Sequence, residues 1–223
     1  MRKPILLPII FTLILFFVPG ALPSFADDSH LNINIGGECV DPTAPKLEMS
    51  FIIKGEAYMY LWSFLDTTDV KRMWNDFIYI QKNTDIKIIH MFINSGGGSA
   101  FAGLALADEI TRIQREGIKI IAHASGIVAS ATVPILAACS ERFASPGTIF
   151  MVHQPAFTKF LAVENADDIR AQNELMDMLR EQYLQKLTDR TKITLDQWRE
   201  MEQRTTWFDS KKALEIGLID ATE

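Results

Sequence analysis

The chain of 223 residues carries 22 basic and 28 acidic side chains, for a formal net charge of −6 at pH 7. This balance argues against nucleic acid as a partner, because phosphate binding needs clustered lysine and arginine. The length fits one domain with one substantial core.

The first 26 residues have the layout of a secretory signal peptide. Arg2 and Lys3 give a basic start, residues 5–18 are almost entirely apolar, and Ser24 and Ala26 are the small residues expected before a cleavage site. A retained membrane anchor is the alternative, although the apolar run is shorter than the roughly 20 residues of a spanning helix. We expect cleavage after residue 26 and export, to the periplasm or outside the cell.

Residues 27–48 form a polar stretch, with adjacent glycines and two prolines, which predicts an irregular arm. A globular pattern begins at residue 49, so we expect one domain over 49–223. Its first predicted elements are a strand over 51–53 and a helix that includes 74–81. A strand over 86–93 follows, with a nearly continuous apolar run typical of a strand buried on both faces.

Strand and helix patterns then alternate to the end of the chain, which favours an α/β fold with a mainly parallel sheet and right-handed crossovers. We predict helices over 102–116 and 131–139, strands over 118–122 and 148–152, and a turn over 126–130. A long helix follows, with one apolar stripe made of Ile169, Met176, Leu179, Tyr183 and Leu187. Thr194 and Gln197 form a capping box for the next helix. Asp209 or Ser210 caps the last one.

Three consecutive glycines, 96–98, follow the strand over 86–93. A phosphate loop would need a lysine soon after them, and the first lysine is Lys119. A dinucleotide fingerprint would need glycine at position 101, which is Phe101. Glycines here can instead leave backbone N–H groups free to face a ligand oxygen. That is the requirement of an oxyanion hole.

Ser130 lies where a strand gives way to a helix, a position that exposes a hydroxyl beside free backbone N–H groups. A simple capping role is the alternative. A nucleophilic serine also needs a base. His153 ends the next strand, and parallel strands end at one edge of a sheet, so His153 and Ser130 should meet there. His90 is more typical of a core position, and His123 remains open.

Four segments together resemble the proteolytic subunit of the Clp proteases: "FINSGGGSAFAG", "GIVASATVPILAA", "RFASPGTIFMVHQP" and "ALEIGLID". They occur in the family's order and at close to its spacing, over residues 50–221. The resemblance implies a Clp-protease/crotonase-like α/β fold with repeated β-β-α units and a long projecting helix. It also implies Ser130 as nucleophile, His153 as general base, and Gly98 and Ala131 as oxyanion donors. No metal or organic cofactor is implied.

The chain departs from this family at the third catalytic position. The family's aspartate falls on Thr205, and Asp209 is the nearest downstream carboxylate that could replace it. Exported relatives in the same superfamily use a serine–lysine dyad, so Lys186 or Lys192 is an alternative base. The family's ATP-dependent unfoldase is not expected as a partner outside the cytoplasm. Homo-oligomers are expected, with the stripe of the long helix available for contacts between copies.

We therefore predict an exported serine endopeptidase that cleaves peptides or unfolded segments. One alternative is a catalytically decayed relative that serves as an oligomeric binding or scaffold protein. A coenzyme A enzyme of the crotonase type is another. Cys39 and Cys139 either pair after export or leave Cys139 as a small buried side chain.

Overall fold

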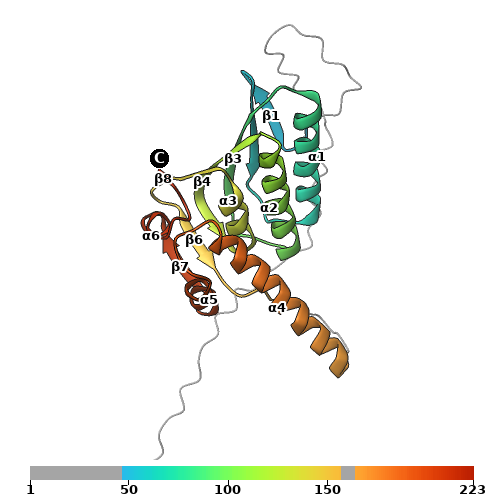
Figure 1. Ribbon diagram of the computed structural model, residues 1–223, viewed down its shortest axis with the longest axis vertical. Helices are drawn as coiled ribbons and strands as arrows, with labels where there is room; N and C mark the ends of the chain where they lie inside the picture. The colour runs from blue at the N-terminus through green and yellow to red at the C-terminus, as the bar shows by residue number, and fades with distance from the viewer. Residues whose placement is uncertain (1–46, 157–163) are drawn as a thin grey trace, which may run out of the picture. The chain divides into compact units, whose positions relative to one another are not determined.

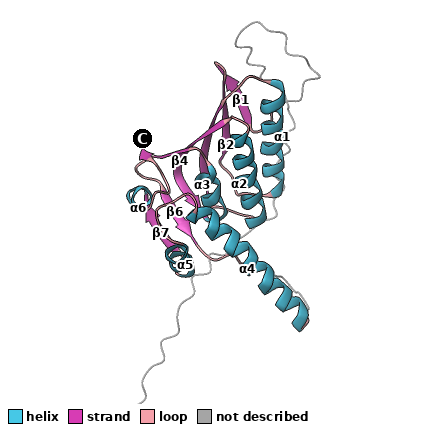
Figure 2. Cartoon of the chain, in the orientation of Figure 1, coloured by secondary structure: helices cyan, strands magenta, loops and turns pink. Residues whose placement is uncertain are grey.

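The computed structural model of the protein describes residues 47–156 and 164–223. The predictions for the signal peptide, for Cys39 and for nearly all of the arm lie outside the described residues. The described chain is α/β, as predicted, with the helices and strands shown in Figures 1 and 2. The predicted repeat of β-β-α units is present in part. The segments β1-β2-α1 and β5-β6-α4 have this order, whereas β3-α2 is a single β-α unit.

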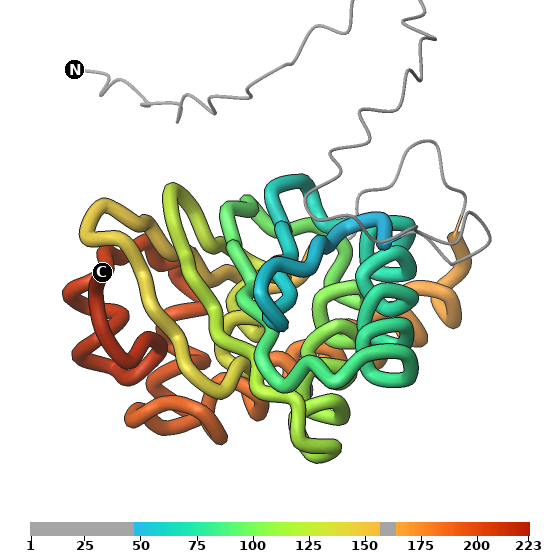
Figure 3. The backbone as a smooth tube through the Cα atoms, turned by 90° about the horizontal axis from the view of Figure 1, so that it is seen from above, coloured from blue at the N-terminus to red at the C-terminus, as the bar shows by residue number. Residues whose placement is uncertain are grey.

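The sheet has the strand order β1-β2-β3-β4-β5-β8, and β6 and β7 continue it from the end of β4. The first four strands are β1 (Ser50–Ile53), β2 (Glu56–Leu61), β3 (Ile88–Ser95) and β4 (Lys119–Ala129). The others are β5 (Glu141–Ala144), β6 (Ile149–Val152), β7 (Thr206–Asp209) and β8 (Ala221–Thr222). All pairs are parallel except β1 with β2 and β6 with β7. Figure 3 shows β1 and α1 on one side and α6 and β8 on the other.

Strand β4 is longer than predicted and serves two neighbours. Its first half pairs with β5, and residues 127–129 pair with β6. The predicted turn over 126–130 is therefore wrong for residues 126–129. The irregularity is a bulge instead: Gly126 has φ of 66°, Asn94 Oδ1 accepts from the N–H of Ile127, and the β3–β4 register shifts there. Beyond the bulge the ladder resumes, and β4 runs directly into Ser130.

Three helices, α1 (Thr67–Asn83), α2 (Ala100–Arg115) and α3 (Val133–Ala138), lie along one face of the sheet (Figure 1). Residues of β3 alternate accordingly, since Ile89, Met91 and Ile93 are fully buried while His90 and Phe92 are partly exposed. The prediction that this strand is buried on both faces is wrong for the described chain. The strand is apolar on both faces, but the helices cover only one of them.

His90, predicted to be a core residue, lies on the opposite, partly exposed face of the sheet. Its Nδ1 is 2.9 Å from Nε2 of His123, and Nδ1 of His123 is 2.7 Å from a carboxylate oxygen of Glu223. Five rings from four strands stack beside this pair: Phe51, Tyr58, Tyr60, Phe92 and Phe143. Neither histidine contacts Ser130, so neither takes part in the site described below.

The long helix α4 (Ala166–Thr188) projects beyond the sheet, as predicted (Figure 1). It is followed by α5 (Leu195–Gln203), which the predicted box of Thr194 and Gln197 caps, and by α6 (Ser210–Glu215), which Asp209 caps. In the described part of the chain no helix is both long and apolar enough to span a membrane. Cys139 is a fully buried free thiol whose pKa burial raises to about 12.

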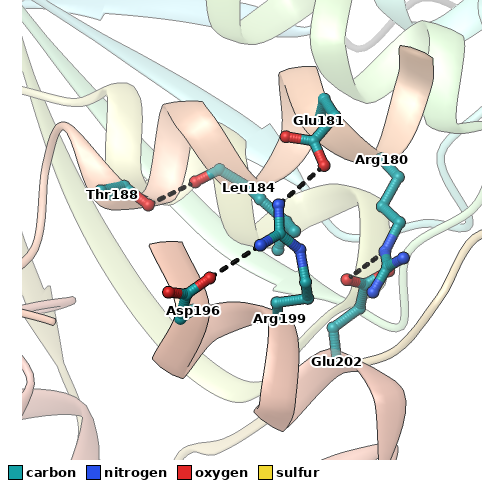
Figure 4. Close-up of polar contacts among 7 residues, drawn as sticks. All are labelled: Arg180, Glu181, Leu184, Thr188, Asp196, Arg199 and Glu202. Atoms are coloured by element: carbon teal, nitrogen blue, oxygen red, sulfur yellow. Dashed lines mark hydrogen bonds and ion pairs between the residues drawn. The ribbon is translucent and has the colours of Figure 1, made fainter. Parts of the chain in front are cut away.

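Charged side chains fasten α5 to α4 (Figure 4). Nε of Arg180 donates to both carboxylate oxygens of Glu202, at 2.9 and 2.8 Å, and Glu202 is almost fully buried. Arg199 bridges Glu181 and Asp196 on the surface nearby. Burial raises the pKa of Glu202, and Arg180 opposes that rise. The pair holds α5, and hence the start of β7, in a fixed place.

We expect Glu202→Ala to lower the free energy of unfolding by about 3–5 kcal/mol, because it leaves the guanidinium of Arg180 buried without its partner. Denaturant unfolding of the purified protein measures this loss. Glu181→Ala is the control, since its ion pair with Arg199 is more exposed, and a loss below about 1 kcal/mol is expected. Equal losses in the two variants would contradict the special role of the buried pair.

Candidate active site

Ser130 and His153 are in contact, as the sequence predicts. Nε2 of His153 lies 2.7 Å from Oγ of Ser130. The pairing of the strands explains the contact, because Ala129 at the end of β4 pairs with Met151 on β6. Ser130 directly follows β4, and His153 directly follows β6. A hydroxyl within hydrogen-bond reach of an imidazole is the arrangement of an activated nucleophile and its base.

The backbone of Ser130 is strained. Its φ of 55° lies in the left-handed region, which costs a residue other than glycine about 1–3 kcal/mol. Buried groups hold it there. The hydroxyl of Thr132 accepts from the N–H of Ala129 at 3.0 Å, and Tyr183 on α4 donates its hydroxyl to the carbonyl of Ser130 at 3.2 Å. Strain held in place by neighbours is characteristic of functional positions.

The three positions of the glycine triplet differ in whether a side chain would fit there. A Cβ on Gly98 would lie 2.1 Å from the carbonyl oxygen of Leu65, and one on Gly97 would lie 2.7 Å from Cβ of Ser130. A Cβ on Gly96 would meet nothing within 4 Å. Two of the three glycines are therefore required by the close approach of the chain to itself. The sequence predicts a ligand in this space, whereas the nearest atoms at Gly97 and Gly98 belong to the chain itself.

Two backbone N–H groups beside Ser130 remain available to a ligand. Leu65 forms a parallel bridge with Gly98: its N–H donates to the carbonyl of Gly97, and its carbonyl accepts from the N–H of Ser99. In such a bridge the N–H of Gly98 points away from Leu65. The N–H of Ala131 lies in the first turn after β4, where helical acceptors are missing. Within the described residues neither group donates to another atom.

A cavity of about 450 Å³ joins these groups. Gly98, Ser130, Ala131 and His153 all line it. The rest of its wall is largely apolar and comes mainly from α2 and α4, with Phe64, Phe101, Leu104, Met176, Leu179 and Tyr183 as its larger side chains. A carbonyl carbon beside Ser130 Oγ would have its oxygen near two free N–H donors, which is the geometry of acyl transfer.

His153 lacks a charged partner among the described residues. Burial lowers its pKa. Val152 pairs with Thr206 in the last pair of β6 and β7, and His153 and Thr205 lie one residue beyond it. Thr205 itself is exposed and has φ of 51°. The position predicted for the third catalytic residue therefore lies next to the last residue paired with β6, in an exposed turn, and it holds an uncharged side chain.

The other predicted candidates lie elsewhere. Asp209 pairs with Ile149 at the far end of β7, about 13 Å along the strand from the row of His153. Its carboxylate accepts from the N–H of Lys212 as the cap of α6. Lys186 pairs with Asp108, and the side chain of Lys192 packs at Gly217. The structure brings none of these three groups to Ser130.

Sequence reasoning missed the functional position of Tyr183. It recognised the residue as part of the apolar stripe of the long helix, which fits its ring. The hydroxyl of Tyr183 gives the residue its second role, since it donates to the carbonyl of the strained residue Ser130. Periodicity shows which face of a helix is apolar, but it carries no signal for a hydrogen bond between segments 53 residues apart.

The chain matches the family model described as Clp protease over residues 48–222. It is 28% identical over 206 residues to ATP-dependent Clp protease proteolytic subunit 1 of Streptomyces coelicolor, which covers 92% of this chain and 86% of that protein. It is 32% identical over 146 residues to the ATP-dependent Clp protease proteolytic subunit of Streptococcus mutans, which covers 65% of this chain and 71% of that protein. The residues matched by the family model include the sheet, the glycine loop and the Ser130–His153 pair. The chain belongs to the Clp protease family.

Proposed function

We propose that the protein is a serine endopeptidase of the Clp type in which Ser130 is the nucleophile and His153 the general base. The 2.7 Å contact between Nε2 of His153 and Oγ of Ser130 carries this proposal. Membership of the Clp protease family supports the reaction class. Its substrates are peptides or unfolded segments, because these can place an extended backbone beside Ser130.

In the first half of the reaction, Oγ of Ser130 attacks the substrate carbonyl carbon while Nε2 of His153 takes the hydroxyl proton. The N–H groups of Gly98 and Ala131 bind the oxyanion that forms. His153 then gives its proton to the leaving amine, and an acyl ester on Ser130 remains. Water, activated by the same imidazole, hydrolyses the ester. No carboxylate of residues 47–156 or 164–223 stabilises the imidazolium in these steps, so we propose the reaction of a slow dyad.

Labelling with a fluorophosphonate tests the proposal, because the reagent modifies only an activated serine. The wild-type protein should be labelled, Ser130→Ala should not be, and His153→Gln should be labelled far more slowly. If the wild-type protein is not labelled, the peptidase assignment fails. The neutral Thr205 then favours the scaffold alternative.

Export and assembly belong to the same proposal. The N-terminal pattern of residues 1–26 supports action outside the cytoplasm without an ATPase partner, and N-terminal sequencing of the mature protein should begin near Asp27. Leu179 and Leu187 of the predicted stripe are buried within the chain and do not serve contacts between copies. The stripe's member Ile169 is exposed, and together with the exposed Leu175 and Met178 it supports association between copies. Light scattering on the mature chain should show an oligomer, and a monomer at micromolar concentration would count against assembly.

Activity should depend on pH through His153. Because burial lowers its pKa, the imidazole stays neutral, and able to accept a proton, at more acidic pH than an ordinary histidine. We expect kcat/KM to fall only below about pH 6.5. A pH–rate profile with a labile peptide measures this limb. A profile still rising well above neutrality would contradict His153 as the base.

Tyr183→Phe should lower kcat by up to about tenfold and leave KM nearly unchanged, since one hydrogen bond contributes about 0.5–1.5 kcal/mol. The ring stays in the cavity wall, while the carbonyl of Ser130 loses its donor. Steady-state kinetics separates the two constants. Tyr60→Phe is the matched control, because Tyr60 lies on the open face of the sheet. A change in KM alone would assign Tyr183 to substrate contact instead.

A further inference from the structure

The apolar cavity beside Ser130 has a buried part and an exposed part. Leu104 and Leu179 are 6% and 8% exposed and belong to the buried part. Phe64 and Phe101 line the same cavity, yet they are 73% and 50% exposed. Two large aromatic rings on the rim of a site leave apolar surface in water, which points to an interaction there.

Both rings are carried by a well-fixed backbone. On one side of Phe64, the carbonyl of Ser63 accepts from the hydroxyl of Ser95 at 2.6 Å. On the other, the N–H of Leu65 donates to Gly97 at 2.8 Å. Phe101 lies in the first turn of α2, just after the cap residue Ser99. The rings therefore come from two separate elements and meet the cavity at set positions, as residues that select a ligand do.

The described lining of the cavity is also uncharged. Its lining contains no Asp, Glu, Lys or Arg among the described residues, and His153 is its titratable member next to Ser130, with a pKa that burial lowers. Tyr183 stays protonated because burial raises its pKa. A charged substrate side chain would lose its hydration here without gaining a partner, so apolar side chains are favoured.

The volume fits more than one side chain. Cavities of about 300–1,000 Å³ hold whole small ligands, and this one, at about 450 Å³, lies in that range. One large apolar side chain next to the attacked carbonyl would occupy the part lined by Leu104 and Leu179. Phe64 and Phe101 line the same cavity with largely exposed rings, which leaves apolar surface for another.

We propose that Phe64 and Phe101 form a second apolar subsite, so that the protein prefers segments carrying two large apolar side chains, one at the cleaved bond and one close to it. This proposal rests on the proposed peptidase function. The two rings act as specificity-determining residues, because they contact the substrate away from the reacting atoms.

The test uses fluorogenic peptides of equal length with leucine at the cleaved position. In one set phenylalanine is placed in turn at each flanking position, and in the matched set serine replaces it. The wild-type protein should cleave one phenylalanine peptide with kcat/KM about tenfold above its serine counterpart, which is the effect of burying part of an aromatic ring. Phe64→Ala and Phe101→Ala should each remove most of this preference, because they lower kcat/KM for the phenylalanine peptide far more than for its serine counterpart.

Trp62→Ala is the matched control, since Trp62 is 60% exposed but does not line the cavity. It should keep the preference. Fluorophosphonate labelling of the wild-type protein and the same variants tests the peptidase function separately from the second subsite. Failure to label the wild-type protein overturns the peptidase function. Normal labelling with equal kcat/KM for both peptide sets, or with a preference that survives both phenylalanine substitutions, overturns the second subsite alone.

Discussion

Thr205→Asp should raise peptidase activity by two to four orders of magnitude. The last pair of β6 and β7 is Val152 with Thr206, so a carboxylate at position 205 is one residue beyond the ladder on the side of His153. From there we expect it to hold the imidazole and stabilise its protonated form. Losing such a carboxylate while keeping the geometry costs a serine protease about 10⁴ in kcat. The left-handed backbone at Thr205 also suits aspartate better than a β-branched residue.

Kinetics at fixed pH and over a pH range measures the gain. The new carboxylate raises the pKa of His153, so the acid limb of the profile should move to higher pH in Thr205→Asp. Thr205→Asn is the matched control, since it can orient the ring without adding charge, and we expect a much smaller gain. Asp209→Asn should change activity little. An unchanged Thr205→Asp together with an inactive Asp209→Asn would reverse this assignment.

Gly98→Ala should reduce activity by at least about 10²-fold, the usual cost of losing one oxyanion donor. Its Cβ would lie 2.1 Å from the carbonyl oxygen of Leu65, and that atom belongs to backbone which cannot rotate away. The loop must therefore move, and the N–H of Gly98 moves with it. The φ of 154° adds strain for any side chain. We also expect the variant to unfold more easily.

Gly96→Ala provides the comparison, because the added methyl group meets nothing within 4 Å. It should retain stability and most activity, although it changes the same loop two residues away. Activity of both variants is measured with a small ester as well as a peptide, to separate chemistry from peptide binding. Equal losses at 96 and 98 would show that loop flexibility matters more than the position of one N–H group.

The sequence was most informative where local patterns were strong. The caps at Thr194 and Asp209 and the long helix were predictable because hydrogen-bonding side chains and a 3.6-residue period lie within short segments. Strand β2 was missed although its alternate residues, Ala57, Met59 and Leu61, are fully buried. The bulge at Gly126 was predicted as a turn, because a glycine with small neighbours has the same local signature in both.

At the site, the predicted contact between Ser130 and His153 follows from strand ends that meet at one edge of the sheet. The position of Thr205 followed only from family resemblance, and its place one residue beyond the last β6–β7 pair depends on a register between strands more than 50 residues apart. The contact of Tyr183 with Ser130 and the places of Phe64 and Phe101 in the cavity wall are tertiary features that no local pattern reveals. Gly97 and Gly98 were recognised, but their tight contacts with Ser130 and Leu65 were not.

Two residues of helix α4, three positions apart in the sequence, make contacts that fix the site. Tyr183 holds the carbonyl of Ser130, and Arg180 holds Glu202 on the helix that leads to Thr205. The geometry of the candidate site therefore depends on α4 as well as on the sheet. Hydrogen exchange would resolve them as separate units, because an opening of α4 that leaves the strands intact has a lower free energy than global unfolding. The protein would then lose its active geometry before it loses its fold.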